Sequence, residues 1–377
     1  MRAPTDRNAN RRRAVTDTYL DWAATAPLRP EALTALTEAA AAWANPSSVH
    51  GAGRGAAALL DAARRELAAA LDRPAASIVL TGGGTEALGL ALAQADAHLI
   101  SAVEHDAVRA QVPRAGVVPV DRDGIVDLAA LDQMLAVAPR SPLVAVMHVN
   151  NETGVIQPVA EVARIVAARG GRLLIDAVQS AGKLPLPDAD FVAVSAHKLG
   201  GPPGVGALIV REPVAPVQRG GGQERGQRAG TENLPGIAAF AAAATAAAAD
   251  SGWLDRVTAL RDRLEAALRV CFGSALPGAV VHGGGAARIG TIACLGLPGV
   301  AAMTQLMTLD IAGFAVSAGA ACSSGKVRTS HVLGAMAVDG AAAAQAIRVS
   351  FGWTTTAAEV DAFAVAWRAM AVRLGAR

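Results

Sequence analysis

Lys198 stands at a position where a lysine can do covalent chemistry. It follows an apolar stretch that ends at Ser195, and the chain then continues through Leu199-Gly200-Gly201-Pro202. A lysine at the carboxyl end of a buried strand can form a Schiff base with an aldehyde, while Ser195 and His197 beside it can bind a phosphate group. A solvated lysine in a loop is the alternative, and Lys198 taken alone does not exclude it.

Two further segments contain residues suited to the same kind of site. Asp176 ends the apolar stretch Leu173-Leu174-Ile175, where a carboxylate could pair with a protonated pyridine nitrogen. A helix N-cap is an equally good interpretation of this aspartate. The stretch from Leu80 to Glu86 passes through Gly82-Gly83-Gly84-Thr85 into a helical pattern, and a helix start with free N–H groups favours an anion. The segment lacks the Gly-Lys-Ser/Thr and GxGxxG patterns, so neither a nucleoside triphosphate nor a dinucleotide is favoured.

A sheet is the element that would bring these segments together. Short apolar runs alternate with helical patterns through the first two thirds of the chain, which is typical of a parallel sheet covered on both faces. Open α/β sheets bind ligands at the carboxyl ends of their strands, so Asp176 and Lys198 are expected at one edge. The predicted strands are 78–80, 99–101, 117–120, 143–148, 172–176, 191–195 and 207–210, and the predicted helices include 55–71, 128–136 and 159–168.

The C-terminal part of the sequence indicates a second, smaller domain. A long Ala-rich helical region is predicted after Gly230, and its length suits a connector between domains. Further strands are predicted at 291–295, 314–317 and 347–351, followed by a last helix from about Ala357. We expect the segment before Asn45 to pack on the small domain or on the junction. The predicted division is a basic tail (1–18), a large domain (19–250) and a small α+β domain (251–377).

Composition excludes several classes of partner. Hydrophobic residues make up 52% of the chain, and 34 basic residues nearly balance 32 acidic ones, which argues against nucleic acid as a partner. The absence of a long uninterrupted apolar run argues against a membrane span, and we expect a cytoplasmic protein. The three cysteines, Cys271, Cys294 and Cys322, do not have the CxxC spacing of zinc sites, so no metal site is predicted.

Several motifs occur in a characteristic order along the chain. They are Tyr19-Leu20-Asp21-Trp22-Ala23-Ala24-Thr25, Asn45-Pro46-Ser47-Ser48-Val49-His50, Glu104-His105, His148-Val149-Asn150-Asn151-Glu152-Thr153-Gly154, Asp176-Ala177-Val178-Gln179-Ser180, Ser195-Ala196-His197-Lys198, Gly220-Gly221-Gly222-Gln223-Glu224-Arg225-Gly226, Arg228-Ala229-Gly230-Thr231, Ser317-Ala318-Gly319-Ala320-Ala321-Cys322-Ser323-Ser324-Gly325 and Ile347-Arg348-Val349-Ser350. This series resembles the cysteine desulfurases of the nitrogen-fixation and iron–sulfur cluster assembly type, which are class V members of the fold type I aminotransferases. The resemblance extends from Tyr19 to about Leu374.

The resemblance implies pyridoxal 5′-phosphate as the cofactor, a mostly parallel seven-stranded sheet and a homodimer. By resemblance, Lys198 carries the cofactor and moves the Cα proton of the substrate, while His105 stacks on the ring and accepts the thiol proton. Arg348, helped by Asn151, would bind the substrate carboxylate, and a buried structural ion pair is the alternative for Arg348. The other implied cofactor contacts are Asp176 at the ring nitrogen, Gln179 at the ring hydroxyl, and Gly84, Thr85, Ser195, His197 and the second protomer's Thr231 at the phosphate.

Cys322 is implied to receive the sulfur. Its surroundings are Ser, Gly and Ala, which suit a flexible, exposed loop, and a thiolate there could reach the substrate and later a separate acceptor. The implied reaction converts L-cysteine to L-alanine and leaves a persulfide on Cys322 for a sulfur acceptor or an iron–sulfur scaffold protein. Cys322 could also contact a cluster transiently. Cys271 and Cys294 fit ordinary core cysteines.

Some positions depart from the family pattern, and other functions stay open. Gly83-Gly84 replaces a commoner Ser-Gly pair, Trp22 stands where a smaller or polar residue is usual, and the basic stretch 326–329 could alter the choice of partner. A selenocysteine lyase or another class V aminotransferase is one alternative, although an aminotransferase requires no thiol at Cys322. A catalytically silent scaffold of the same fold is the other alternative. It is disfavoured by the joint presence of five residues: Lys198, Asp176, His105, Arg348 and Cys322.

Overall fold

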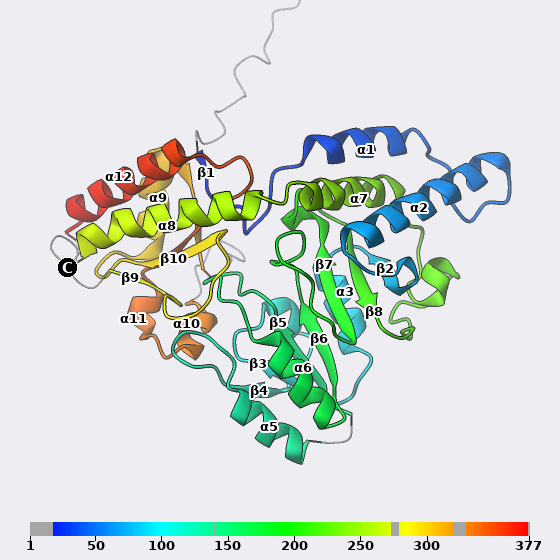
Figure 1. Cartoon of the computed structure of the whole chain (residues 1–377), viewed down its shortest axis with the longest axis horizontal. Coiled ribbons are helices and arrows are strands. Elements are labelled where there is room, and N and C mark those ends of the chain that lie inside the picture. Colours follow the sequence, from blue (N-terminus) through cyan, green and yellow to red (C-terminus); the bar gives the residue numbers. More distant parts are fainter. Residues whose placement is uncertain (1–17, 139–140, 273–278, 320–328, 376–377) are drawn as a thin grey trace, which may run out of the picture.

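A seven-stranded sheet forms the centre of the larger part of the molecule (Figure 1). The computed structural model describes residues 18–138, 141–272, 279–319 and 329–375, with residues 270–272 described by their backbone alone. The strand order is β2-β8-β7-β6-β5-β3-β4, in which β8 is antiparallel to both neighbours and the other pairs are parallel. The strands are β2 (Ile78–Thr81), β3 (His98–Ser101), β4 (Gly116–Val118), β5 (Leu143–Met147), β6 (Arg172–Asp176), β7 (Phe191–Ser195) and β8 (Gly206–Val210).

The predicted single, mostly parallel sheet is therefore confirmed. Its central strands are rich in Val, Leu and Ile and are buried on both faces, which explains why they read as continuous apolar runs. The predicted strand 117–120 ends earlier, at Val118, because Pro119 has no N–H to donate to the ladder.

Helices cover both faces of this sheet. One face packs against α1 (Pro30–Ala40), α2 (Gly51–Ala70), α5 (Leu128–Val137), α6 (Val159–Ala168) and α7 (Leu234–Ala249). The other face packs against α3 (Gly84–Leu92) and α4 (Asp106–Arg109). Side chains of successive strand residues alternate between these two cores, as strand geometry requires. The Ala-rich α7 lies against both α1 and α2, where small side chains allow close packing.

A second sheet and core lie in the C-terminal part (Figure 1). The sheet has the order β12-β13-β10-β9 and is antiparallel throughout. Its strands are β9 (Val280–Val281), β10 (Ile292–Gly296), β12 (Ser317–Ala318) and β13 (Ala346–Ser350), and the helices of this part are α8 (Trp253–Phe272), α9 (Ala302–Ile311), α10 (His331–Ala335), α11 (Gly340–Ala343) and α12 (Ala357–Arg373). The described part of the chain also forms short 3₁₀ turns at η1 (Ala75–Ser77), η2 (Ala196–Lys198) and η3 (Gln223–Gly226).

The start of the described chain joins this second part. β1 (Thr18–Tyr19) pairs in parallel with β11 (Phe314–Ala315), and Asp21 forms a bridge with Ser350 of β13. The following α1 packs instead on α7 in the larger part. The N-terminal segment thus contacts both parts of the molecule.

Two expectations need correction. The strand predicted at 314–317 is two strands, because the chain changes sheet at Val316: β11 pairs with β1, and β12 pairs with β13. The single Ala-rich helical region is α7 and α8, with a bend of 74° where Ser251 and Gly252 interrupt the helix. Among the described residues no single helix is long and apolar enough to cross a membrane. Only the bent pair of α7 and α8, taken together, has that length and composition. The division into domains at 250/251 stays a prediction.

Candidate active site

Three chain segments meet where β6 and β7 end and α3 begins. Asp176 is the last residue of β6, Ser195 is the last residue of β7, and Gly84 is the first residue of α3. A Cβ added at Gly84 would lie 2.8 Å from Val178 Cγ2 and 3.4 Å from Ser195 Cβ, so a glycine is needed for this close approach. The segments singled out in the sequence therefore converge at one edge of the sheet, together with the free N–H groups of the α3 N-terminus.

Lys198 lies beside this edge, on η2. Its Nζ donates hydrogen bonds to the carbonyl oxygens of Ala23 and Ala24, both at 2.7 Å. Burial, followed by the positive charge of Arg348, lowers the Lys198 pKa to about 8. A lysine with such a pKa has a substantial neutral fraction near physiological pH, and only the neutral amine can attack an aldehyde.

His197 is neutral at physiological pH. Burial lowers its pKa to about 4, and repulsion from Lys198 and Lys183 adds to the shift. Its Nδ1 lies 3.2 Å from Thr25 Oγ1. A neutral imidazole has one N–H, so His197 can donate a hydrogen bond to an anion without adding a charge.

Asp176 and Gln179 are the buried polar residues at this edge of the sheet. Asp176 Oδ1 accepts a hydrogen bond from Val178 N at 2.9 Å, and burial raises the Asp176 pKa while the charges of His105 and Lys198 oppose that shift. Such a buried carboxylate is stabilised by a cationic partner. Gln179 donates from Nε2 to the Ala23 carbonyl at 2.9 Å, and its buried Oε1 has no hydrogen-bond partner. This oxygen is an acceptor available to a hydroxyl group.

Arg348 reaches the same region from β13. It donates from NH1 to the Asn151 carbonyl at 2.9 Å and from NH2 to Asp21 Oδ1 at 2.9 Å, while its buried Nε has no partner. The ion pair with Asp21 corresponds to the structural alternative raised for Arg348. The two roles are compatible, because the guanidinium has five N–H donors.

The remaining predicted site residues are either exposed or outside the described part of the chain. His105 is exposed and caps α4, where its Nδ1 accepts a hydrogen bond from Ala107 N at 3.0 Å. Thr85 and Thr231 are also exposed. Among the described residues, no hydrogen bond joins Thr231 to Lys198, Asp176 or Gln179. Cys322, the predicted sulfur acceptor, lies outside the described residues.

Cys294 differs sharply from the predicted nucleophile. It is fully buried in β10, and burial raises the pKa of its thiol far above the ordinary value. Its burial makes it a core residue, as expected. Because its thiol stays protonated, it is also a poor nucleophile. The side chain of Cys271 is not among those described.

Three ionisable residues of the site received no role from the sequence. Asp21 pairs with Arg348, Lys183 donates from Nζ to the Gln179 carbonyl at 2.9 Å, and Glu104 accepts from Ser101 Oγ at 2.5 Å and Met147 N at 2.7 Å. Burial lowers the Lys183 pKa to about 7 and raises the Glu104 pKa to about 8. Asp21 and Glu104 stood inside matching motifs, which was a usable signal, whereas nothing local marked Lys183.

Known proteins share this fold and sequence over most of the chain. The family model described as Aminotransferase class-V matches residues 18–363. A cysteine desulfurase of Cereibacter sphaeroides is 42% identical over 370 residues, which cover 91% of this chain and 92% of that protein. A NifS-like protein from Rickettsia africae superposes with a TM-score of 0.86 at 30% identity, covering 94% of this chain and 99% of that chain. A structure of SspA in complex with cysteine has a TM-score of 0.74 at 25% identity, with 90% and 100% coverage.

The chain belongs to the class-V aminotransferases, a family of enzymes that depend on pyridoxal phosphate. Within that family its relatives are the cysteine desulfurases, and it is an enzyme of this type.

Proposed function

We propose that the protein removes sulfur from L-cysteine, releases L-alanine, and keeps the sulfur as a persulfide on Cys322. The observation that carries this proposal is the cluster of Lys198, with its lowered pKa, beside Asp176 and Gln179 in a chain whose relatives are cysteine desulfurases. Selenocysteine lyase activity and transamination are the competing reactions.

The described residues fit pyridoxal 5′-phosphate. Lys198 would hold its aldehyde carbon, Asp176 its ring nitrogen and Gln179 Oε1, an acceptor that lacks a partner, its ring hydroxyl. When bound, the cofactor supplies an electron sink for negative charge at the substrate Cα. The phosphate ligands would be the α3 N-terminus at Gly84 with Thr85, Ser195, His197 and, from a second protomer, Thr231.

The protein's own groups then handle protons and sulfur. Lys198, with a pKa of about 8, can take and return the Cα proton at mild pH, and His105 can take the proton of the substrate thiol. Arg348 and Asn151 would hold the substrate carboxylate. The Cys322 thiolate attacks the substrate sulfur, so that an S–S bond forms and the Cβ–S bond breaks. The electron pair of the broken bond stays on Cβ, which takes a proton to become the methyl group of alanine.

The proposal includes partners and a location. Thr231 would complete the phosphate site of a second copy, which makes the working enzyme a homodimer. The persulfide would pass to an acceptor protein, such as an iron–sulfur scaffold, and the basic stretch 326–329 would influence which acceptor binds. We propose a cytoplasmic location for this exchange.

Incubation with L-cysteine under reducing conditions tests the function. Sulfide and alanine are quantified together for the wild-type protein and for Cys322→Ala. We expect equal amounts of both products from the wild type, and for Cys322→Ala we expect an unchanged cofactor spectrum with no persulfide. Conversion of L-cysteine to a keto acid, with neither alanine nor sulfide formed, would favour the aminotransferase alternative, and an undiminished persulfide yield in the variant would remove Cys322 from the mechanism.

A further inference from the structure

Arg29 is bonded to the backbone that directly follows Lys198. Its backbone N donates to the Gly200 carbonyl at 2.8 Å, and its Nε donates to the Leu199 carbonyl at 3.1 Å. Gly200 has φ +96°, and a Cβ added there would lie 2.6 Å from Arg29 Cγ, so this approach requires a glycine. One residue of the N-terminal segment therefore fixes the two residues after Lys198.

The Arg29 guanidinium lies over the ring of Trp353, which belongs to the second part of the molecule. Its Cζ is 3.8 Å from the ring centroid, and Arg29 is 6% exposed. Among the described residues its Nη2 has no hydrogen-bond partner. A cation over an aromatic face is attracted by the ring, and more strongly when the pair is buried than when it is exposed. The ring of Trp353 is therefore a favourable partner for the Arg29 charge.

Trp353 is held in turn by two other tryptophans. The Trp22 ring meets it edge to face with 4.7 Å between the ring centroids, and the Trp253 ring does so at 6.3 Å. Such edge-to-face pairs are favourable. Trp22 Nε1 also donates to the Tyr19 carbonyl at 3.0 Å, which fixes the orientation of the ring. Trp22 departs from the family pattern, and its large ring supports Trp353.

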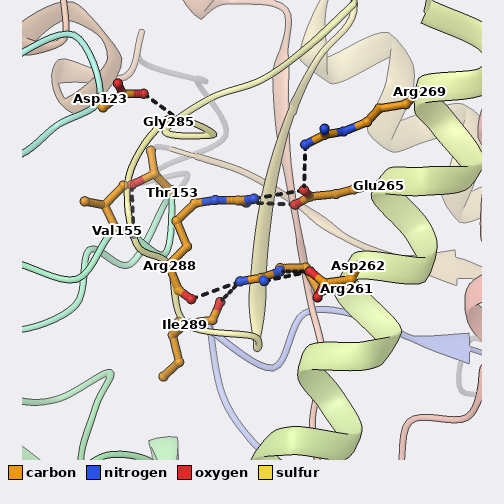
Figure 2. A network of polar contacts seen from close by, with 10 residues as sticks. All are labelled: Asp123, Thr153, Val155, Arg261, Asp262, Glu265, Arg269, Gly285, Arg288 and Ile289. Carbon is orange, nitrogen blue, oxygen red and sulfur yellow. Dashed lines mark hydrogen bonds and ion pairs between the residues drawn. The ribbon is translucent and has the colours of Figure 1, made fainter.

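The backbone that leads to Trp353 is joined to the polar network of Figure 2. In that network Arg288 forms a buried, two-pronged ion pair with Glu265 of α8, both bonds at 2.8 Å. Three residues after Arg288, the Thr291 carbonyl accepts a hydrogen bond from the backbone N of Phe351 at 2.9 Å. Phe351 lies two residues before Trp353, so the position of Trp353 is fixed relative to α8.

Trp353 and Arg348, the proposed ligand of the substrate carboxylate, lie on one stretch of chain. Arg348 is in β13, which pairs with both β10 and β12, and Trp353 follows the end of this strand by three residues. Lys198 instead lies on η2, which follows β7 of the large sheet. The contact of Arg29 with Trp353 thus joins the turn of Lys198 to the strand of Arg348.

We propose that Arg29 is a positioning residue that, by stacking on Trp353, sets the distance between Lys198 and Arg348. This inference rests on the proposed function, in which Arg348 binds the substrate carboxylate and Lys198 moves the Cα proton of the same molecule. A weaker contact would let the amine and the substrate Cα separate, and misplacement by about 1 Å costs ~100-fold in rate. The charge of Arg348 also lowers the Lys198 pKa, so separation would raise that pKa.

The holoenzyme variants Arg29→Met and Trp353→Leu test this role, with Arg172→Met as the matched control. Arg172 also lies over an aromatic ring, that of Phe191 at 5.7 Å, but both residues begin strands of the large sheet and so lie at the end opposite the site. Alanine formation is measured over a range of L-cysteine concentrations. For the two test variants we expect the rate at saturating L-cysteine to fall ~10-fold and KM to stay within ~3-fold of wild type. For the control we expect both within ~2-fold of wild type.

Two further variants separate the stacking from a general loss of packing. Trp353→Phe keeps an aromatic face under the guanidinium, so it should recover most of the rate that Trp353→Leu loses. The double variant Arg29→Met/Trp353→Leu should be no more than ~2-fold slower than the slower single variant, because both changes remove the same contact. Equal losses in Trp353→Phe and Trp353→Leu, or losses that multiply in the double variant, would overturn the proposal.

Capture of pyridoxal phosphate by the full-length apoprotein supplies a readout that needs no turnover. It is measured across the pH range for Arg29→Lys and Trp353→Leu, neither of which changes the net charge near Lys198. The amine reacts only when neutral, so a raised Lys198 pKa should move the midpoint of the capture rate upward by ~0.5 pH unit in both variants and leave it unchanged in Arg172→Met.

An unchanged midpoint in Arg29→Lys would overturn the proposal, even if Trp353→Leu does not fold. The same shift in Arg172→Met would do so as well, because the effect would then not be specific to the Arg29 contact. A wild-type protein that captures the cofactor but releases no alanine from L-cysteine would refute the proposed function. The difference between the capture midpoints would still report on the position of Lys198 in that case.

Discussion

The two halves of the candidate site are built in different ways. The half assigned to the cofactor consists of Asp176 and Ser195, which end two adjacent parallel strands of one sheet, and Lys198, which lies on the 3₁₀ turn directly after the second of them. The half assigned to the substrate is assembled from distant parts of the chain: Asp21 in the N-terminal segment, Asn151 in a turn and Arg348 in β13 of the second sheet.

This contrast explains how each half is stabilised. The strand ends are fixed by backbone ladders and buried apolar cores, so their side chains need few partners of their own. The substrate half depends on polar contacts between side chains, such as the Arg348 to Asp21 ion pair and the Glu152 to Ser330 hydrogen bond. Substitutions in the first half should therefore remove chemistry, whereas those in the second half should change positions and charges.

The largest expected effect is that of Lys198→Met. Loss of the only group proposed to bind the cofactor covalently should remove the bound-cofactor absorbance and lower the rate of alanine formation at least ~10³-fold. The matched control is Lys183→Met, since Lys183 is also half-buried, also has a lowered pKa, and lies against Gln179. We expect Lys183→Met to keep the absorbance and to lose less than ~10-fold in rate. The reverse result would exchange the roles of the two lysines.

A pH experiment tests whether the charge of Arg348, in the substrate half, affects the pKa of Lys198, in the cofactor half. Because the Lys198 pKa is lowered from 10.5 to about 8, the amine is protonated below about pH 8 and neutral above it. The rate at which apoprotein captures pyridoxal phosphate should therefore rise with pH and level off above about pH 8. Arg348→Met removes the largest charge that lowers this pKa, so the midpoint should move upward.

Comparing the wild type with Arg348→Met separates the titration of Lys198 from that of the cofactor. The ionisations of the cofactor itself are the same for both, so they cancel in the difference between the two midpoints. The capture rate is followed by absorbance across the pH range. An identical midpoint for wild type and Arg348→Met would mean that the two halves are electrostatically independent.

The first half could be predicted from the sequence. Apolar runs set the strands, and the residues after Ile175 and Val194 then had to lie at the carboxyl edge, because parallel strands end on one side. The seven predicted strands all belong to the sheet, with errors only at their ends. Lys198 and Asp176 needed no knowledge of distant contacts.

The second half could not be derived in this way. Nothing near Arg348 indicates that it contacts Asp21, because the partner is 327 residues away along the chain. The partners of Glu152 are similarly remote, and the split between β11 and β12 depends on which sheet each pair of residues meets. Motif resemblance indicated that Arg348 belonged to the site, but its contacts followed only from the folded chain.

The smallest expected effect is that of Cys294→Ala, which tests whether sulfur transfer is confined to one thiol. Cys294 lies in β10 directly opposite Arg348 of β13, so it is the cysteine to test beside the substrate half. Its thiol is fully buried and its pKa is raised, so it should neither ionise nor accept sulfur. The variant should form persulfide at a rate within ~2-fold of wild type and lose about 1 kcal/mol of unfolding free energy from the small cavity. Persulfide yield and denaturant unfolding measure the two quantities, and a large loss of persulfide without a loss of stability would show that a buried cysteine takes part in the transfer.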